Sequence, residues 1–188
     1  MSTRSVTLVR TGQRVERSAA RLPELFQLAR ELCPDEFPAE ETRALDALRE
    51  HVSLAYVDGL RAEVAEKLAL ERGVLSLDLF SIHGCGPVSL HDDKFRYPGV
   101  YFVIVVAHSG RLGLADHRSR AVRHQVGEIV LLDPHRRHAL VPEGLRAREY
   151  PYERTHSPVH AADDQFLFLD FDVKRSLLRE RFRGATPR

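Results

Sequence analysis

The sequence predicts a mainly β fold, in which N-terminal helices support an antiparallel jelly-roll core. Two observations predict it: apolar residues recur every three or four positions before Val74, and every two positions in several segments after it. No helical pattern separates the later strands, which favours an antiparallel sandwich or closed barrel over alternating β-α-β units. We expect a single domain, with helical support over 1–73, the jelly-roll core over 74–173 and a C-terminal helix or tail over 174–188.

Three helices are predicted in the N-terminal third. The first covers 18–33, where the apolar residues form one stripe, and the Cys33-Pro34 step ends it. A second helix is expected to begin near Pro38, and a third to end at Gly73, a residue that often follows the last helical turn.

The rest of the chain has the pattern of strands. Residues 100–107 (VYFVIVVA) are β-branched and aromatic, which suits a central strand. Five further strands are expected at LSLDLFSI, RLGLAD, EIVLL, LRAREY and FLFLDFDV, which are residues 75–82, 111–116, 128–132, 145–150 and 166–173. Turn residues separate them at Ser109-Gly110, Asp133-Pro134 and Glu143-Gly144.

Composition narrows the classes of function. The net charge of +1 on 188 residues creates no extended positive electrostatic field that would attract nucleic acid or an anionic membrane. Cys33 and Cys85 suit neither a disulfide framework nor a CxxC zinc site, so we expect free thiols in a reducing compartment. The longest apolar run has eight residues, against the roughly 20 of a membrane helix, and the N-terminus lacks a signal-peptide pattern. We therefore expect a cytoplasmic protein; no feature indicates its oligomeric state.

One histidine has a carboxylate two residues after it. This pair is His91 and Asp93, and on a strand both side chains would point to one face while Asp92 points away. A third ligand is expected from a neighbouring strand at His138, where the chain re-enters the barrel after Asp133-Pro134. Two imidazoles and one carboxylate on one face are the ligand set of non-haem iron(II) oxygenases. A helical HExxH zinc motif is absent.

Residues 75–148 resemble the 2-oxoglutarate and iron(II)-dependent oxygenases, in style the prolyl-hydroxylase-like branch. The segment LSLDLFSIHGCGPVSLHDD is similar to that family's strand, glycine turn and HxD strand, and GEIVLLDPHRRHAL is similar to its glycine-led strand ending in the distal metal histidine. The resemblance implies a double-stranded β-helix core. It also implies Fe(II) held by His91, Asp93 and His138, with 2-oxoglutarate as the co-substrate and hydroxylation as the reaction.

In that family a basic residue about ten positions after the distal histidine binds the far carboxylate of the co-substrate. Arg148 lies ten positions after His138, and Arg146 lies eight after it and follows Gly144. The resemblance therefore implies Arg148 as the co-substrate ligand, with Arg146 as the alternative. Arginine suits this role because its planar fork donates two hydrogen bonds to a carboxylate.

Two other functions stay open. A cupin-type metal enzyme without 2-oxoglutarate is suggested by Gly127 and His138, which have the glycine-to-histidine spacing of a cupin's second motif. The second open function is that of a non-enzymatic jelly-roll module that binds a metal or another ligand. For an enzyme we expect a small, polar and possibly anionic substrate, because basic residues are expected to border one barrel end: Arg118, Arg120, Arg123, Arg136 and Arg137. His83 and Cys85 either line the pocket, or only the glycines Gly84 and Gly86 beside them matter there, for the turn.

Overall fold

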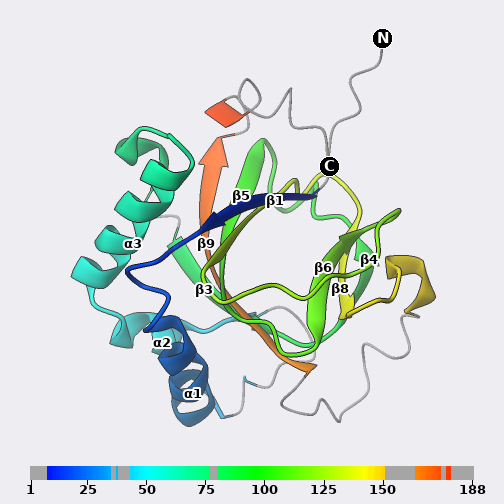
Figure 1. Ribbon diagram of the computed structural model, residues 1–188, viewed down its shortest axis with the longest axis horizontal. Coiled ribbons are helices and arrows are strands. Elements are labelled where there is room, and N and C mark those ends of the chain that lie inside the picture. The colour runs from blue at the N-terminus through cyan, green and yellow to red at the C-terminus, as the bar shows by residue number, and fades with distance from the viewer. Residues whose placement is uncertain are drawn as a thin grey trace.

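Two antiparallel sheets form the body of the protein in the computed structural model (Figure 1). The structure describes residues 8–34, 37, 43–76, 80–150, 164–174 and 177–178. The first sheet has six strands in the order β1 (Leu8–Arg14), β7 (Glu128–Leu132), β5 (Val100–His108), β9 (Phe166–Lys174), β3 (Phe80–Cys85) and β2 (Arg43–Ala44). The second has three strands in the order β4 (Val88–His91), β8 (His138–Pro142) and β6 (Leu112–Asp116).

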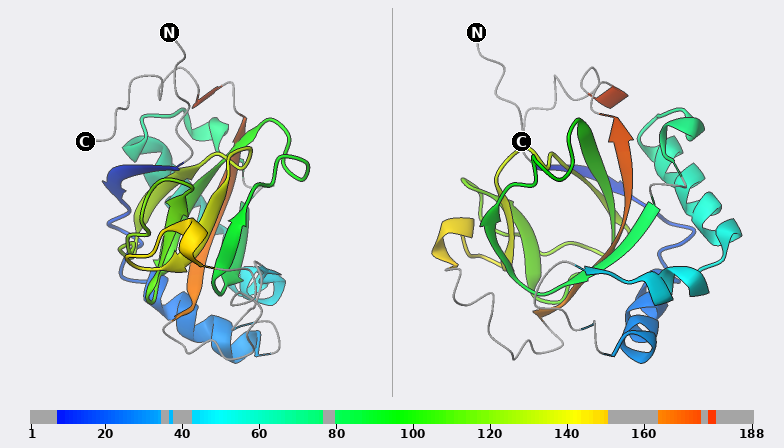
Figure 2. Two further views of the ribbon diagram at one scale, coloured as in Figure 1. Left: turned by 90° about the vertical axis from the view of Figure 1, so that its right-hand side faces the viewer. Right: turned by 180° about the vertical axis from the view of Figure 1, so that it is seen from behind.

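The helices cover one face of the six-stranded sheet. They are α1 (Leu22–Leu32), α2 (Asp46–His51) and α3 (Leu54–Lys67), followed by the short 3-10 helix η1 (Arg72–Val74). The front view (Figure 1) and the rear view (Figure 2, right) both show the helices beside the six-stranded sheet, on the side away from the three-stranded sheet. None of the described helices is long and apolar enough to cross a membrane.

Strand β5 illustrates how the sheet divides the core into two layers. Val103 and Val105 belong to the apolar cluster that packs the sheet against the helices. Ile104 and Val106 point the other way and belong to the cluster between the two sheets, as the two-residue period of a strand requires. A continuous apolar run is therefore expected at this strand, because both of its faces are buried.

The predicted class is confirmed at the level of a mainly β protein with two antiparallel sheets and a few helices, an arrangement consistent with a jelly roll. Strands β5, β6, β7 and β9 occupy predicted segments, and β3 begins at Phe80, within the predicted segment 75–82. The predicted start of the second helix at Pro38 lies outside the described residues, as does most of the predicted C-terminal helix.

Two expectations about the elements were wrong, and one strand was missed. The third helix ends at Lys67 rather than at Gly73, which lies in η1. The segment LRAREY is not a strand: it contains the 3-10 helix η2 (Ala147–Glu149), where the backbone N–H of Arg146 donates to the Glu149 carboxylate at 2.9 Å. Strand β1 was not predicted at all, and it pairs with β7 at the edge of the large sheet.

Candidate metal centre

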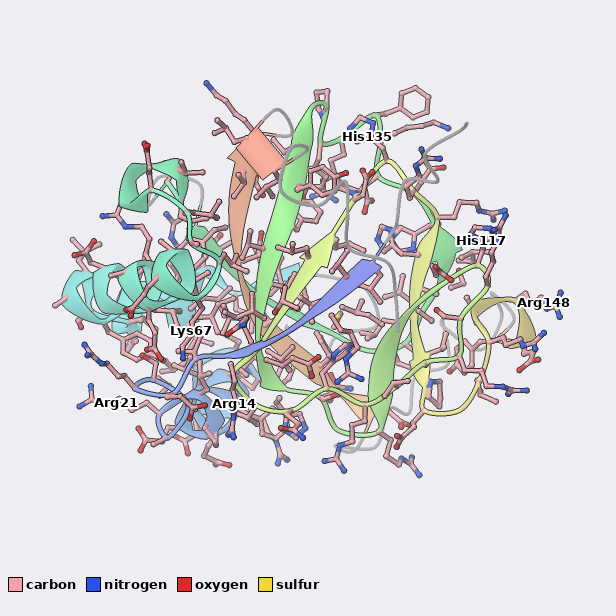
Figure 3. The ribbon with its side chains drawn as sticks, turned by 45° about the horizontal axis from the view of Figure 1, so that its top comes forward. Arg14, Arg21, Lys67, His117, His135 and Arg148 are labelled. Atoms are coloured by element: carbon pink, nitrogen blue, oxygen red, sulfur yellow. The ribbon has the colours of Figure 1, made fainter. Side chains whose placement is uncertain are left out.

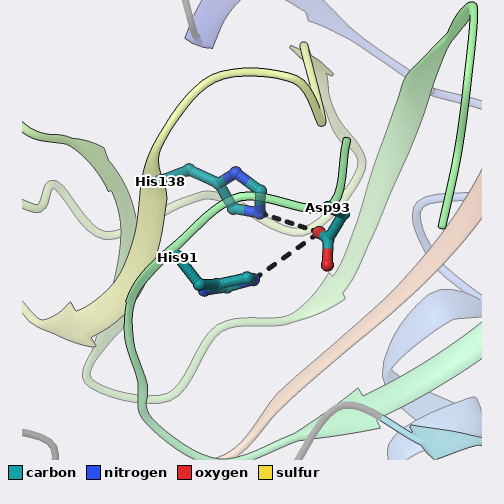
Figure 4. Close-up of side chains that lie close together, drawn as sticks. All are labelled: His91, Asp93 and His138. Atoms are coloured by element: carbon teal, nitrogen blue, oxygen red, sulfur yellow. Dashed lines mark ion pairs between the residues drawn. The ribbon is translucent and has the colours of Figure 1, made fainter. Parts of the chain in front are cut away.

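The three residues that the sequence predicts as metal ligands converge between the two sheets (Figure 4). His91 ends β4 and His138 begins β8, and the antiparallel register places them directly opposite each other. Their ring centroids are 4.4 Å apart. The Asp93 Oδ2 atom lies 3.6 Å from Nε2 of His91 and 3.4 Å from Nε2 of His138. One potential ligand atom from each residue lies within 4.8 Å of the others.

Asp93 lies just beyond strand β4 but is still fixed in position. Its backbone N–H donates to the carbonyl of Pro134 at 2.8 Å, which ties it to the turn that precedes His138. Its own carbonyl accepts hydrogen bonds from the backbone N–H groups of Arg96 and Tyr97, both at 3.0 Å. These hydrogen bonds hold the main chain of Asp93 beside the turn, from which its carboxylate reaches both imidazoles.

The two rings are oriented by backbone carbonyls. Nδ1 of His91 lies 2.7 Å from the carbonyl oxygen of Ser89, and Nδ1 of His138 lies 2.8 Å from that of Arg136. A carbonyl oxygen only accepts, so each Nδ1 carries the hydrogen, and a neutral ring then presents the lone pair of Nε2. This is the second contact that metal-binding histidines usually make.

The donor set therefore fits a cation. With neutral rings, two lone pairs and one carboxylate meet with no hydrogen atom between them. Ligands bound at about 2.1 Å and separated by about 90–110° lie about 3.0–3.4 Å apart, close to the two observed distances. Two nitrogens and one carboxylate suit iron(II) with open positions. Among the described residues, these three form the group of histidine, cysteine and acidic side chains that lie close enough together to hold a metal ion.

The electrostatics of the group point the same way. Burial opposes charge on both Asp93 and His91, but the neighbouring imidazoles hold the pKa of Asp93 far below its usual range. The Asp93 carboxylate and the Ser89 carbonyl raise the pKa of His91 above its ordinary value. The carboxylate is thus ionised and attracts positive charge, whether from protons on the rings or from a metal ion.

A cavity of about 380 Å³ opens onto this group, a volume that suits a small molecule. Its wall is largely apolar and comes from both sheets. The side chains around it are Ser81, His83, Cys85, Pro87, Val88, Ser89, His91, Asp93, Arg96, Tyr97, Phe102, Ile104, Leu114, Leu132, His138, Leu140, Phe166, Phe168, Asp170 and Asp172. His83 and Cys85 thus line the pocket, one of the two alternatives left by the sequence.

The two arginines implied as co-substrate ligands lie elsewhere. Ala147, between them, packs against Ala139 and Val141, the β8 residues that point away from the cavity. Arg146 and Arg148 therefore lie on the outer side of the small sheet, and neither lines the cavity. Figure 3 shows Arg148 at the edge of the molecule, with its side chain directed outward. The strand register assumed for this segment fails because η2 replaces the predicted strand.

The other basic residues expected near the barrel mouth are also exposed. The guanidinium of Arg120 donates to the carbonyl of Gly144 at 2.6 Å, and that of Arg137 donates to the carbonyl of Leu90 at 3.2 Å. Arg118 contacts its neighbour His117. These arginines, with Arg123 and Arg136, are absent from the described lining of the cavity, in which Arg96 is the one arginine.

Sequence reasoning missed Asp170 and Asp172. A signal was present in FLFLDFDV, where both acids fall on the same strand face as Phe166 and Phe168. Arg96 and Tyr97 were also missed, because they lie in a turn whose place in the fold depends on the hydrogen bonds to Asp93.

Comparison with known proteins gives only distant structural matches. No protein-family model matches the sequence, and no curated protein matches it. The crystal structure of SnoN, described as a non-heme alpha ketoglutarate dependent epimerase from nogalamycin biosynthesis, aligns with a TM-score of 0.45 and 12% identity, covering 90% of this chain and 77% of that one. A match this distant says nothing of the activity of this chain.

Proposed function

We propose that this protein is a non-haem iron(II) oxygenase acting on a small molecule, with the metal held by His91, Asp93 and His138. The observation that carries the proposal is the meeting of two Nε2 atoms and one carboxylate oxygen in a cavity. Three ligands on one side of an ion leave further positions for dioxygen and a co-substrate. Bound iron would supply the activation of dioxygen, which no side chain performs.

The chain itself would orient the ligands and exclude water. The carbonyls of Ser89 and Arg136 fix the two rings, so the ligand geometry exists before any substrate enters. Tyr97 packs edge-on against Phe102, with ring centroids 4.8 Å apart, and both rings line the cavity beside the metal group. Such apolar walls strengthen electrostatic interactions inside the site and limit side reactions with water.

We further propose 2-oxoglutarate as the co-substrate, on the strength of the sequence resemblance. Because Arg146 and Arg148 lie outside the cavity, we assign its far carboxylate to Arg96, the arginine in the described lining. An anaerobic titration of iron-loaded protein with 2-oxoglutarate tests this through the charge-transfer absorption of the complex. Arg96→Ala should weaken binding at least about tenfold, because a charge-assisted pair to a carboxylate is lost.

Arg148→Ala is the matched control, since it removes the same charge from a residue outside the cavity lining. Weakened binding in Arg148→Ala alone would show that the segment after Gly144 enters the cavity in the complex. If neither variant changes the affinity, Arg96 is not the anchor.

A second candidate is a cupin-type iron enzyme without 2-oxoglutarate. One observation favours it: the side of the cavity formed by the large sheet carries Asp170 and Asp172, which would repel a dicarboxylate. Measurement of 2-oxoglutarate consumption and succinate formation with a panel of metabolites separates the two candidates. Turnover that requires iron but not 2-oxoglutarate would select the second, and iron binding without any turnover would select a binding module.

A further inference from the structure

The six-stranded sheet contributes two carboxylates to the cavity that holds the metal group. Asp170 and Asp172 are two residues apart on β9, so both point to the inner face of the strand. In the register, Asp170 lies opposite Ser81 and Ile104, and Asp172 lies opposite Phe102. The metal ligands come from the other sheet and the turn after it, so the acids and the metal occupy different walls of one cavity.

The surroundings of the two acids differ. Oδ1 of Asp170 lies 2.7 Å from Nδ1 of His83, whose ring stacks on Phe168 at 5.3 Å between centroids. Asp172 has no hydrogen bond or ion pair with any side chain in the part of the chain that the structure describes. A structural role within the His83 pair thus accounts for Asp170 but leaves Asp172 unexplained.

The carboxylates of Asp170 and Asp172 repel each other when both are ionised. Burial and, after it, the nearby charge of Asp170 raise the pKa of Asp172 to about 6, while His83 acts in the opposite sense. Two neighbouring carboxylates in a partly apolar cavity gain most from a bound cation, which relieves both the repulsion and the desolvation. Apart from the metal group, the described lining holds two basic side chains, His83 and Arg96. His83 pairs with Asp170, and neither of them forms an ion pair with Asp172 among the described residues, so a cation for Asp172 would have to come from outside the chain.

We propose that Asp170 and Asp172 form a subsite for a cationic group, an ammonium or guanidinium, of the small molecule that enters this cavity. The cation subsite itself rests on the two acids of β9. The further statement that the opposite end of the molecule reacts at the metal rests on the proposed function. The inference replaces the expectation of an anionic substrate, because the exposed arginines that suggested one do not line the cavity. It also makes the enzyme selective for amines over acids of the same shape.

Three probes of nearly equal size test the subsite: n-pentylammonium, pentan-1-ol and pentanoate, each titrated by NMR into the full chain at pH 7.5. The ammonium should bind at least about tenfold more tightly than the alcohol, as expected for a charge-assisted contact, and pentanoate should bind most weakly. Asp172→Asn should remove most of the preference while keeping the side-chain shape. Glu143→Gln, which removes one exposed negative charge outside the cavity, should leave it intact.

Equal affinity for the ammonium and the alcohol, tighter binding of pentanoate, or an unchanged preference in Asp172→Asn would each overturn the subsite. The titrations are run on both metal-free and iron-loaded protein. Ammonium selectivity in a protein that fails to bind iron would uphold the subsite and defeat the proposed function. Iron binding without ammonium selectivity would do the reverse.

Discussion

Replacement of Asp172 by asparagine should make the protein more stable at neutral pH. The carboxyl group has an ordinary pKa of 3.8 and one of about 6 in the folded chain, because burial and the charge of Asp170 disfavour ionisation. A difference of about two pKa units corresponds to at most about 3 kcal/mol. Asp172 is partly exposed, and solvent screening reduces this figure, so we expect a gain of about 1–2 kcal/mol for Asp172→Asn at pH 7.5.

The sign of the pH dependence follows from the raised pKa. Between about pH 6 and pH 4 the folded state holds a proton on Asp172 that the unfolded state has released, so the wild type gains stability as the pH falls through this window. The advantage of Asp172→Asn should therefore shrink towards zero near pH 4.

Urea unfolding of both proteins at a series of pH values, with a chelator present, measures this difference directly. Glu143→Gln controls for the change in net charge. A variant less stable than the wild type at pH 7.5, or a difference that does not vary with pH, would refute the reasoning. The first result would mean that Asp172 has a favourable partner in the folded chain, and the second that its pKa is the same in the folded and unfolded states.

Two further predictions concern the framework around the site. Burial opposes the charge of Glu128, but His124 and Arg10 beside it lower its pKa to about 2, so its stabilising effect should be lost as the pH falls from about 4.5 through 2. Glu128→Gln should cost about 2 kcal/mol of unfolding free energy at pH 7 in urea titrations, and unchanged stability would contradict this. Gly113→Ala would drive its Cβ into the backbone of Val122, so we expect a destabilisation of about 1–3 kcal/mol. A thermal midpoint within error of the wild type would refute that packing.

The fold was predictable where burial alone selects the residues. The segment 100–107 is apolar on both faces because the helices lie on one side of β5 and the second sheet on the other. Strand β1 was not predictable in this way. Its residues are exposed or half-buried, and its position depends on pairing with β7, including the Arg10–Glu128 ion pair, which no local pattern reports.

In the site, too, local features were predictable from the sequence and non-local pairing was not. The spacing of His91 and Asp93 was readable because it is local, whereas the pairing of His91 with His138 depends on the register of β4 and β8. Arg148 was misplaced because a strand was assumed where Glu149 closes a 3-10 turn onto Arg146. Non-local pairing also explains why the acids of β9 were not assigned to the cavity.

The central claim is that His91, Asp93 and His138 hold one metal ion, and iron content measured after anaerobic loading tests it most directly. The wild type should retain one iron(II) per chain after gel filtration. His138→Ala should bind at least about a hundredfold more weakly with its thermal midpoint preserved, because a ligand is lost from the site and not from the core. His117→Ala, which changes an exposed histidine outside the cavity, should behave as the wild type. Full occupancy in His138→Ala, or an empty wild type, would contradict the account.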